Sequence, residues 1–297
     1  MGGTGFLGRH LAKELLASGC RVAVATRNRQ AAAGQVEDGV ELVEWDGRLA
    51  LFPADVLEAV DGVVNFSGES IGNRRWSASV KREIVKSRVE STRSIVKGIN
   101  EGMIRPKVFI NASAVGYYGP HRDEVITESE APGQDFLAEV CRQWEAEAYQ
   151  VQSPLTRVAT LRIGVVLGSQ GALARMTMPY KFYAGGPLGK GEQWLSWIHV
   201  QDLVRMLSFI LEEDRVSGPV NGTAPNPVTM RDFAKILGEV LGRPAWLPVP
   251  GFLLKIALGQ MSEMLLHGQR AVPEKILEAG FAFKYPDLRG ALEDLLI

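Results

Sequence analysis

Three glycines near the start of the chain, Gly2, Gly5 and Gly8, have the spacing of a dinucleotide-binding turn. The first glycine of such a turn allows a tight bend, the second lets backbone N–H groups approach a pyrophosphate, and the third lets the following helix pack closely on a strand. Phe6 and Leu7 lie within the same turn. These residues predict a site where the diphosphate of a dinucleotide cofactor lies at the N-terminus of a helix.

A cation that follows the next predicted strand bears on the choice of cofactor. Residues 21–26 predict a short, buried parallel strand, and Arg27 comes directly after it. An acidic residue at this place holds the ribose 2′-hydroxyl in NAD-binding proteins, whereas a guanidinium fits a 2′-phosphate. Arg27, with Asn28 or Arg29, therefore favours NADP. The alternative interpretation of Arg27 is a solvated loop cation.

Strand-like and helix-like segments alternate along the first half of the chain, which is typical of a parallel sheet flanked by helices. Strands are expected over 40–45, 59–66, 107–113 and 157–168, and helices over 9–18, 81–100 and 137–151. After about residue 169 glycine and proline become frequent, and a helix is expected over 229–241, with Thr229 as N-cap and Gly242 as its stop. We therefore predict an α/β fold: a doubly wound Rossmann-type domain over 1–168 and a smaller, mostly helical lobe over 169–297. Some segments near 197–224 are expected to return to the Rossmann core.

The glycine turn follows Met1 directly, which leaves no residues for the strand that normally enters such a turn. In a doubly wound sheet that first strand is central. Without it, the strands around 22–25 and 63–66 would face each other across an empty slot, with buried backbone groups unpaired at roughly 1–3 kcal/mol each. We therefore expect that the first β-strand is missing from this chain and that the natural protein starts some six or more residues upstream.

The composition argues against several classes of partner. A formal net charge of -1 gives no basic patch for nucleic acid. The four histidines share no metal-ligand spacing, so no metal site is expected. Cys20 and Cys141 are too few and too scattered for a disulfide framework, which favours a reducing cytoplasm. No apolar run approaches a membrane span, and the most apolar stretch, 252–266, is interrupted by Lys255 and Glu263, which favours a core or interface helix.

Several segments resemble the extended short-chain dehydrogenase/reductase superfamily. They are Gly2-Gly3-Thr4-Gly5-Phe6-Leu7-Gly8, Asn65-Phe66-Ser67-Gly68-Glu69, 112–119 and 197–203. Others are similar to the atypical "epimerase family" proteins, which pair this fold with a small C-terminal domain: Arg74-Arg75-Trp76, 116–119, Trp144-Glu145, 185–189 and 268–273. The segments cover nearly the whole chain in the family's order, so the chain is identified as a member of that family.

The resemblance implies roles for several residues. Gly2, Gly5 and Gly8 would contact the cofactor diphosphate, and Arg27 would take the ribose phosphate. Asn65, Ser67 and Gly68 would line the path from the adenosine to the nicotinamide, although a plain βα turn also needs a glycine and a capping serine. A small-molecule substrate is expected, and a homodimer stays open.

The sequence departs from the superfamily pattern at its catalytic pair. Members normally use a tyrosine as general acid/base, with a lysine four residues later that lowers the tyrosine pKa and holds the nicotinamide ribose. No tyrosine of this chain has a lysine at that spacing. When Trp144-Glu145 is aligned with the end of the catalytic helix, Leu137 and Cys141 occupy the two places. Leucine has no proton to exchange, and a thiol on an apolar helix face has a raised pKa, so neither can do this chemistry.

Other side chains are the candidates for catalysis. Ser113 keeps the place where the superfamily's serine hydrogen-bonds a substrate oxygen, and Tyr117 or Tyr118 could donate a phenolic proton. A turn hydroxyl and ordinary aromatic packing are the alternatives. His199 with Asp202 forms either an oriented imidazole or a structural segment.

Two functions from different classes remain. The first is an NADP(H)-dependent oxidoreductase or nucleotide-sugar-epimerase-like enzyme, which the retained Ser113 and the second lobe favour. The alternative is an NADPH-binding regulatory protein, like the relatives labelled cell-division inhibitors, which the missing tyrosine–lysine pair favours. The segment 185–191 lacks the Lys-Ser/Thr ending of a phosphate loop. It is interpreted as a substrate-side lid that carries Lys190, or as a surface loop.

Overall fold

The central sheet is parallel throughout. In the computed structural model, which describes residues 1–46 and 60–297, four strands lie in the order β10-β6-β4-β3. Their bounds are Gly62–Asn65 for β3, Val108–Ala114 for β4, Arg157–Ile163 for β6 and Gly218–Gly222 for β10. β4 is buried along almost its whole length, as expected of a strand covered on both faces.

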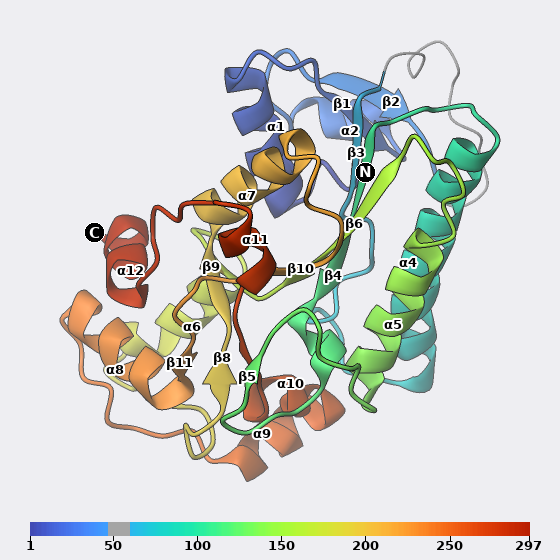
Figure 1. Ribbon diagram of the computed structural model, residues 1–297. Helices are drawn as coiled ribbons and strands as arrows, with labels where there is room; N and C mark the ends of the chain where they lie inside the picture. The colour runs from blue at the N-terminus through green and yellow to red at the C-terminus, as the bar shows by residue number, and fades with distance from the viewer. Residues whose placement is uncertain (47–59) are drawn as a thin grey trace.

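Helices cover both faces of this sheet, so the fold is a doubly wound α/β fold (Figure 1). α4 (Ala78–Asn100) and α5 (Phe136–Ala148) pack side by side on one face. α1 (Phe6–Ala17) and α7 (Val200–Glu212) pack together on the other. Alternate residues of β4 serve the two faces: Ile110 joins the core beneath α1 and α7, and Phe109 joins the core beneath α4.

Two further strands form a separate parallel pair. β1 (Ala23–Thr26) pairs with β2 (Glu41–Glu44), and α2 (Arg29–Ala33) connects them. Within the described residues β1 and β3 share no hydrogen-bonded ladder. Met1 lies beside β3, because its amino group donates to the Val64 carbonyl at 2.7 Å and its carbonyl accepts from the Phe66 N–H at 3.0 Å. The expectation of a strand upstream of Met1 stays a prediction.

The C-terminal part of the chain builds a second core next to the sheet. Its helices are α6 (Ala172–Lys181), α8 (Met230–Leu241), α9 (Gly251–Leu258), α10 (Glu263–Leu266), α11 (Glu274–Glu278) and α12 (Leu288–Leu296), with a 3₁₀ turn η2 (Gly259–Ser262). Short strands complete it: β7 (Val165–Leu167) with β9 (Trp197–His199), β8 (Trp194–Leu195) with β11 (Val228–Thr229), and β5 (Val125–Ile126) with β12 (Arg270–Ala271). Trp197 and Phe233 are buried at its centre.

The predicted limits of α8 are confirmed. The Thr229 side chain accepts from the Asp232 N–H at 3.1 Å, and Gly242 ends the helix in the left-handed conformation with φ of 61°. Among the described helices, none is both long and apolar enough to cross a bilayer.

Candidate functional site

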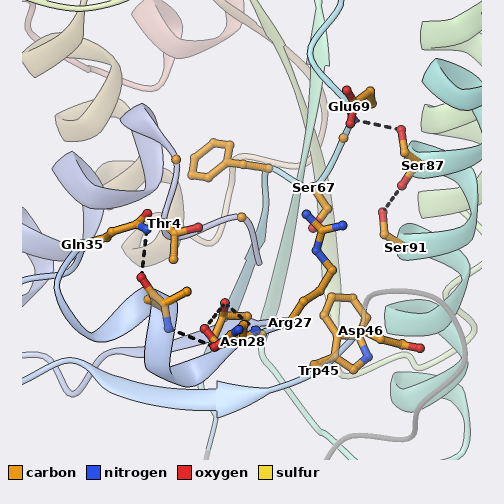
Figure 2. A pocket seen from close by; sticks show the side chains of 18 of the residues that line it. Thr4, Arg27, Asn28, Gln35, Trp45, Asp46, Ser67, Glu69, Ser87 and Ser91 are labelled. Atoms are coloured by element: carbon orange, nitrogen blue, oxygen red, sulfur yellow. Dashed lines mark hydrogen bonds between the residues drawn. The ribbon is translucent and has the colours of Figure 1, made fainter. Parts of the chain in front are cut away.

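A cavity of about 440 Å³ opens beside the glycine turn. It lies at the carboxyl ends of β1, β2 and β3, where open α/β sheets bind their ligands (Figure 2). The lining residues come from the turn, the ends of these strands, α2 and α4: Gly2, Thr4, Gly5, Ala25, Thr26, Arg27, Asn28, Ala31, Ala32, Gln35, Trp45, Asp46, Phe66, Ser67, Gly68, Glu69, Glu83, Ser87 and Ser91. We call this cavity the cofactor pocket.

The glycine turn is packed too closely to carry side chains. Gly2 has φ of +70°, and a Cβ on Gly8 would lie 2.4 Å from the Gly3 Cα. α1 begins after Gly5 without a side-chain cap and without an acidic residue in its first turn. The N–H groups of Phe6, Leu7 and Gly8 have no acceptor within the described residues. This helix terminus therefore has free N–H donors that can bind an anion.

Phe6 and Leu7 serve the turn through their backbones, because their side chains point elsewhere. The Phe6 ring packs against Gly168, where an added Cβ would lie 2.4 Å from the ring. Leu7 packs on the hydrophobic core beneath α7. Neither side chain lines the cofactor pocket.

Arg27 lies at the end of β1, and Figure 2 shows its side chain extended toward Ser67. It is the only cation among the described residues that line the cofactor pocket. No ion pair or hydrogen bond engages its guanidinium within the described part of the chain. Asn28 instead caps α2 by accepting the Ala31 N–H at 2.9 Å, and Arg29 lies outside the pocket lining. The pocket thus offers one uncommitted positive charge.

The turn after β3 is held by a buried amide. Asn65 is fully buried, donates to Asn111 Oδ1 at 2.7 Å, and accepts the Ser67 N–H at 3.0 Å. Ser67 and Gly68 line the cofactor pocket, whereas Asn65 does not. A Cβ on Gly68 would lie 2.9 Å from Arg88 Cζ, so the glycine allows this arginine to support the turn from beneath. Asn65 therefore shapes the pocket without lining it.

Two of the three predicted catalytic hydroxyls are buried and engaged. Ser113, 3% exposed, donates from Oγ to Glu145 Oε1 at 2.6 Å. Tyr118, 1% exposed, donates to Asn221 Oδ1 at 2.6 Å and accepts from Arg162 at 3.0 Å. Burial raises the pKa of Tyr118 to about 12. Both hydroxyls therefore act in hydrogen bonds inside the protein.

An ion pair connects these hydroxyls. Arg162 on β6 donates through Nε and Nη2 to the two carboxylate oxygens of Glu145 on α5, each at 2.9 Å. Both side chains are almost completely buried. The Arg162 guanidinium also lies 3.5 Å from the centre of the Tyr117 ring. We call Ser113, Tyr118, Glu145, Arg162 and Asn221 the polar cluster.

Tyr117 differs from its neighbour Tyr118. It lies in the 3₁₀ turn η1 (Val115–Tyr118), is only half-buried, and its hydroxyl has no hydrogen-bond partner within the described residues. Its ring packs edge-on against Tyr118, with centroids 5.4 Å apart. Of the three predicted hydroxyls, that of Tyr117 alone has no hydrogen-bond partner within the described residues. None of the three residues lines the cofactor pocket.

Sequence reasoning missed Glu145, Arg162 and Asn221 as site residues. In the sequence, Trp144-Glu145 marks the family and the end of the catalytic helix, and Arg162 is one residue of a predicted strand. A single charged residue within the mostly apolar run from Val158 to Val166 is a usable signal, because a buried cation requires a buried partner. Its partner could not be identified from spacing alone.

His199 and Asp202, the other candidates from the sequence, make contacts that stabilise the fold. His199 accepts the Gln201 N–H on Nδ1 at 3.1 Å and stacks on Tyr285. Asp202 is fully buried and accepts the backbone N–H groups of Lys284 and Tyr285 at 2.8 and 2.7 Å. This pair fastens the C-terminal segment to α7.

Cys141 lies buried on α5. Burial raises the pKa of its thiol to about 11, which keeps it protonated at neutral pH. In the described ranges, 1–46 and 60–297, no three His, Cys, Asp or Glu side chains gather as metal ligands.

Comparisons with known proteins agree with this architecture. Residues 1–221 match the NAD dependent epimerase/dehydratase family, and residues 249–295 match a domain of unknown function, DUF1731. The chain is 43% identical over 296 residues to the epimerase family protein YfhF of Bacillus subtilis, covering 99% of this chain and 96% of that protein.

Two solved structures are similar over 99% of this chain. The human epimerase family protein SDR39U1, crystallised with NADPH, has 34% identity and a TM-score of 0.89, with 97% of that chain covered. A nucleoside-diphosphate sugar epimerase of Corynebacterium glutamicum has 31% identity and a TM-score of 0.78, with 57% of that chain covered.

Proposed function

The chain belongs to the NAD dependent epimerase/dehydratase family, and we propose that it is an NADP(H)-dependent oxidoreductase or nucleotide-sugar-epimerase-like enzyme that acts on a small molecule. The observation that carries the proposal is the cofactor pocket, which joins an uncapped helix terminus to one uncommitted cation. The human relative crystallised with NADPH supports the same cofactor.

Charge explains why this pocket suits NADP(H). Asp46, Glu69 and Glu83 also line it, and carboxylates repel phosphates. The first turn of α1 and Arg27 are therefore the two places that attract anions. A molecule that carries both a diphosphate and a separate phosphate matches these two places, and NADP(H) is such a molecule.

Tyr117 is the proposed acid/base. When bound, NADP(H) supplies or accepts a hydride, and the protein must move one proton at the substrate oxygen. The Tyr117 hydroxyl is free to do so, while Arg162 lies against its ring and places a positive charge beside the phenol. Ser113 and Tyr118 hold this arrangement in place through the polar cluster.

One observation favours the alternative, an NADPH-binding regulatory protein with little or no catalysis. The Ser113 proton is committed to Glu145 and the Tyr118 proton to Asn221, so two of three candidate hydroxyls are not free to donate. An enzyme with a single free acid/base would be slow, since each positioned acid/base contributes roughly 10²–10⁴-fold to a rate.

Two measurements test the proposal. Calorimetric titration with NADPH and NADH measures cofactor choice, and we expect NADPH to bind at least about tenfold more tightly, equivalent to about 1.4 kcal/mol. A screen of sugar nucleotides and small carbonyl compounds then follows oxidation of NADPH by absorbance. Tight NADPH binding with no turnover on any compound would favour the regulatory alternative, and equal affinity for the two cofactors would contradict the proposed role of Arg27.

A further inference from the structure

α9 is an apolar helix that is not packed into the core. Its sequence is Gly-Phe-Leu-Leu-Lys-Ile-Ala-Leu, and none of its eight residues is buried. Phe252 is 62% exposed and Ile256 70% exposed. Helices in proteins are stabilised mainly by packing of an apolar face, and a large exposed apolar patch marks an interaction site. A surface outside this chain is therefore expected to cover α9.

A groove of about 630 Å³ lies next to α9, away from the cofactor pocket. It is lined by Pro187, Gly189, Lys190, Glu192, Arg231, Lys235, Ala245, Trp246 and Pro248. The groove and the cofactor pocket share no lining residue.

The glycine-rich segment 185–191 forms a fixed wall of this groove. Val249 N–H donates to the Pro187 carbonyl and Gly189 N–H to the Val249 carbonyl, each at 2.9 Å. A Cβ on Gly186 would lie 2.1 Å from the Leu247 carbonyl oxygen, so the two segments can approach this closely only at a glycine. The segment is thus hydrogen-bonded along its length, and the groove is already formed in the free protein.

The groove and α9 form one continuous surface. Pro248 of the groove is followed within three residues by the start of α9 at Gly251. Gly189 and Gly251 also contact the same side chain, because an added Cβ at these positions would lie 2.8 and 3.3 Å from Leu266 Cδ2. We call α9 and the groove together the docking surface.

The groove end of the docking surface is positively charged. Lys190, Arg231 and Lys235 face a single carboxylate, Glu192, among the lining residues. None of the three cations forms an ion pair within the described part of the chain. Arg231 and Lys235 are four residues apart on α8, so they share one face of that helix.

We propose that the docking surface binds an acidic segment of a partner protein, with apolar side chains of that segment on α9 and Trp246 and its carboxylates at Lys190, Arg231 and Lys235. Trp246 is 68% exposed, and tryptophan and arginine are the residue types that dominate binding energy at protein interfaces. Small-molecule sites enclose most of the ligand, whereas this groove is lined largely by exposed side chains. A second copy of the chain is disfavoured, because a two-fold contact would bring the same uncompensated cations together.

Selection from a displayed library of random twelve-residue peptides, with the whole chain and saturating NADPH as bait, tests the proposal. We expect selected peptides to be rich in Asp and Glu and to contain Leu, Phe or Trp. Their affinity should fall at least tenfold for Arg231→Glu/Lys235→Glu and for Ile256→Asp. The matched control is Arg82→Glu/Lys86→Glu, which reverses two exposed cations with the same spacing on α4 and should bind like the parent chain. NADPH affinity should be unchanged in all variants, which shows that they are folded.

Four results would overturn the proposal. Selected peptides that are neutral or basic would contradict the role of the three cations. So would peptides whose affinity for the docking-surface variants equals their affinity for the parent chain. A dimer in light scattering that Ile256→Asp dissociates would assign α9 to a second copy. Co-sedimentation with phosphatidylserine vesicles, lost in Ile256→Asp, would assign the surface to lipid.

Discussion

The cofactor pocket and the polar cluster are both built from strand ends and neighbouring helices. They differ in whether their polar groups have partners within the protein. In the pocket Arg27 is exposed and uncommitted, and the first turn of α1 lacks acceptors. In the polar cluster Arg162 is buried, with its donors directed at Glu145, Tyr118 and a backbone carbonyl. The polar groups of the cofactor pocket therefore remain open to a ligand, whereas those of the polar cluster are satisfied within the folded chain.

Removing one half of the buried ion pair should give the largest effect. Glu145→Ala leaves Arg162 buried without its counter-ion, and we expect the free energy of unfolding to fall by about 3–5 kcal/mol in urea titrations. Glu147→Ala on the same helix is the control, because its partner Arg93 is largely exposed and such pairs contribute about 1 kcal/mol or less. A similar loss in both variants would remove the distinction between the two regions.

Replacing Tyr117 or Tyr118 by phenylalanine, one at a time, should distinguish a role in turnover from a role in stability. With a substrate found by the screen, Tyr117→Phe should lower kcat by about 10–10³-fold, or about 1.4–4 kcal/mol, without changing NADPH affinity. Tyr118→Phe should mainly lower stability, by roughly 1–3 kcal/mol, because Asn221 loses its donor in the interior. If Tyr118→Phe alone abolishes turnover while the protein stays stable, the chemistry belongs to the polar cluster.

Reversing the charge of Arg27 should change the cofactor pocket alone. Arg27→Asp should weaken NADPH binding at least about tenfold, equivalent to about 1.4 kcal/mol, and reverse the preference between NADPH and NADH. Arg29→Asp is the control, since Arg29 is exposed but does not line the pocket. Calorimetry on both variants measures the effect, and equal losses would show a general charge effect.

The smallest expected effect is a pH dependence of the free energy of unfolding, which arises from a second buried polar residue, His199. Burial lowers the pKa of His199, so it stays neutral in the folded protein below the pH at which the unfolded chain takes up a proton, about 6.5. Stability should therefore fall as the pH drops below about 6.5, by at most about 1.4 kcal/mol per pH unit from this residue. His199→Asn, which keeps an acceptor for the Gln201 N–H, should weaken the dependence in urea titrations from pH 7 to 5. An identical dependence in both proteins would assign it to other groups.

Local signals predicted most of the elements, because each depends on residues close in sequence. The single strand expected over 157–168 was wrong, since it divides at Gly164 into β6 and β7, which belong to different sheets. The cap of α8 at Thr229 needs only its own side chain and the next turn, and the buried run of β4 needs only its own residues. The spacing of the glycine turn is also a local signal, although its packing is not, because Gly2 lies against the Phe66 backbone and Gly3 against Val24.

The contacts that define the site were not predictable in the same way. Arg162 meets Glu145 across 17 positions and Tyr118 across 44, and no periodicity relates a strand to a helix at such separations. Trp45 enters the cofactor pocket because β2 pairs with β1, which is a property of the sheet order. Segment 185–191 shows the same limit, because Gly186 is explained by its contact with the Leu247 backbone and Gly189 by its contact with Leu266, both distant in sequence.

Arg162 also determines how the protein should fail on heating. Its guanidinium joins β6, α5, η1 and the Glu128 carbonyl, so none of these elements can loosen without releasing a buried charge. Partial melting around the polar cluster is therefore costly, and this region should unfold as one cooperative unit. Hydrogen exchange of its backbone amides should occur only through global unfolding, whereas the uncapped first turn of α1 should exchange through small local fluctuations.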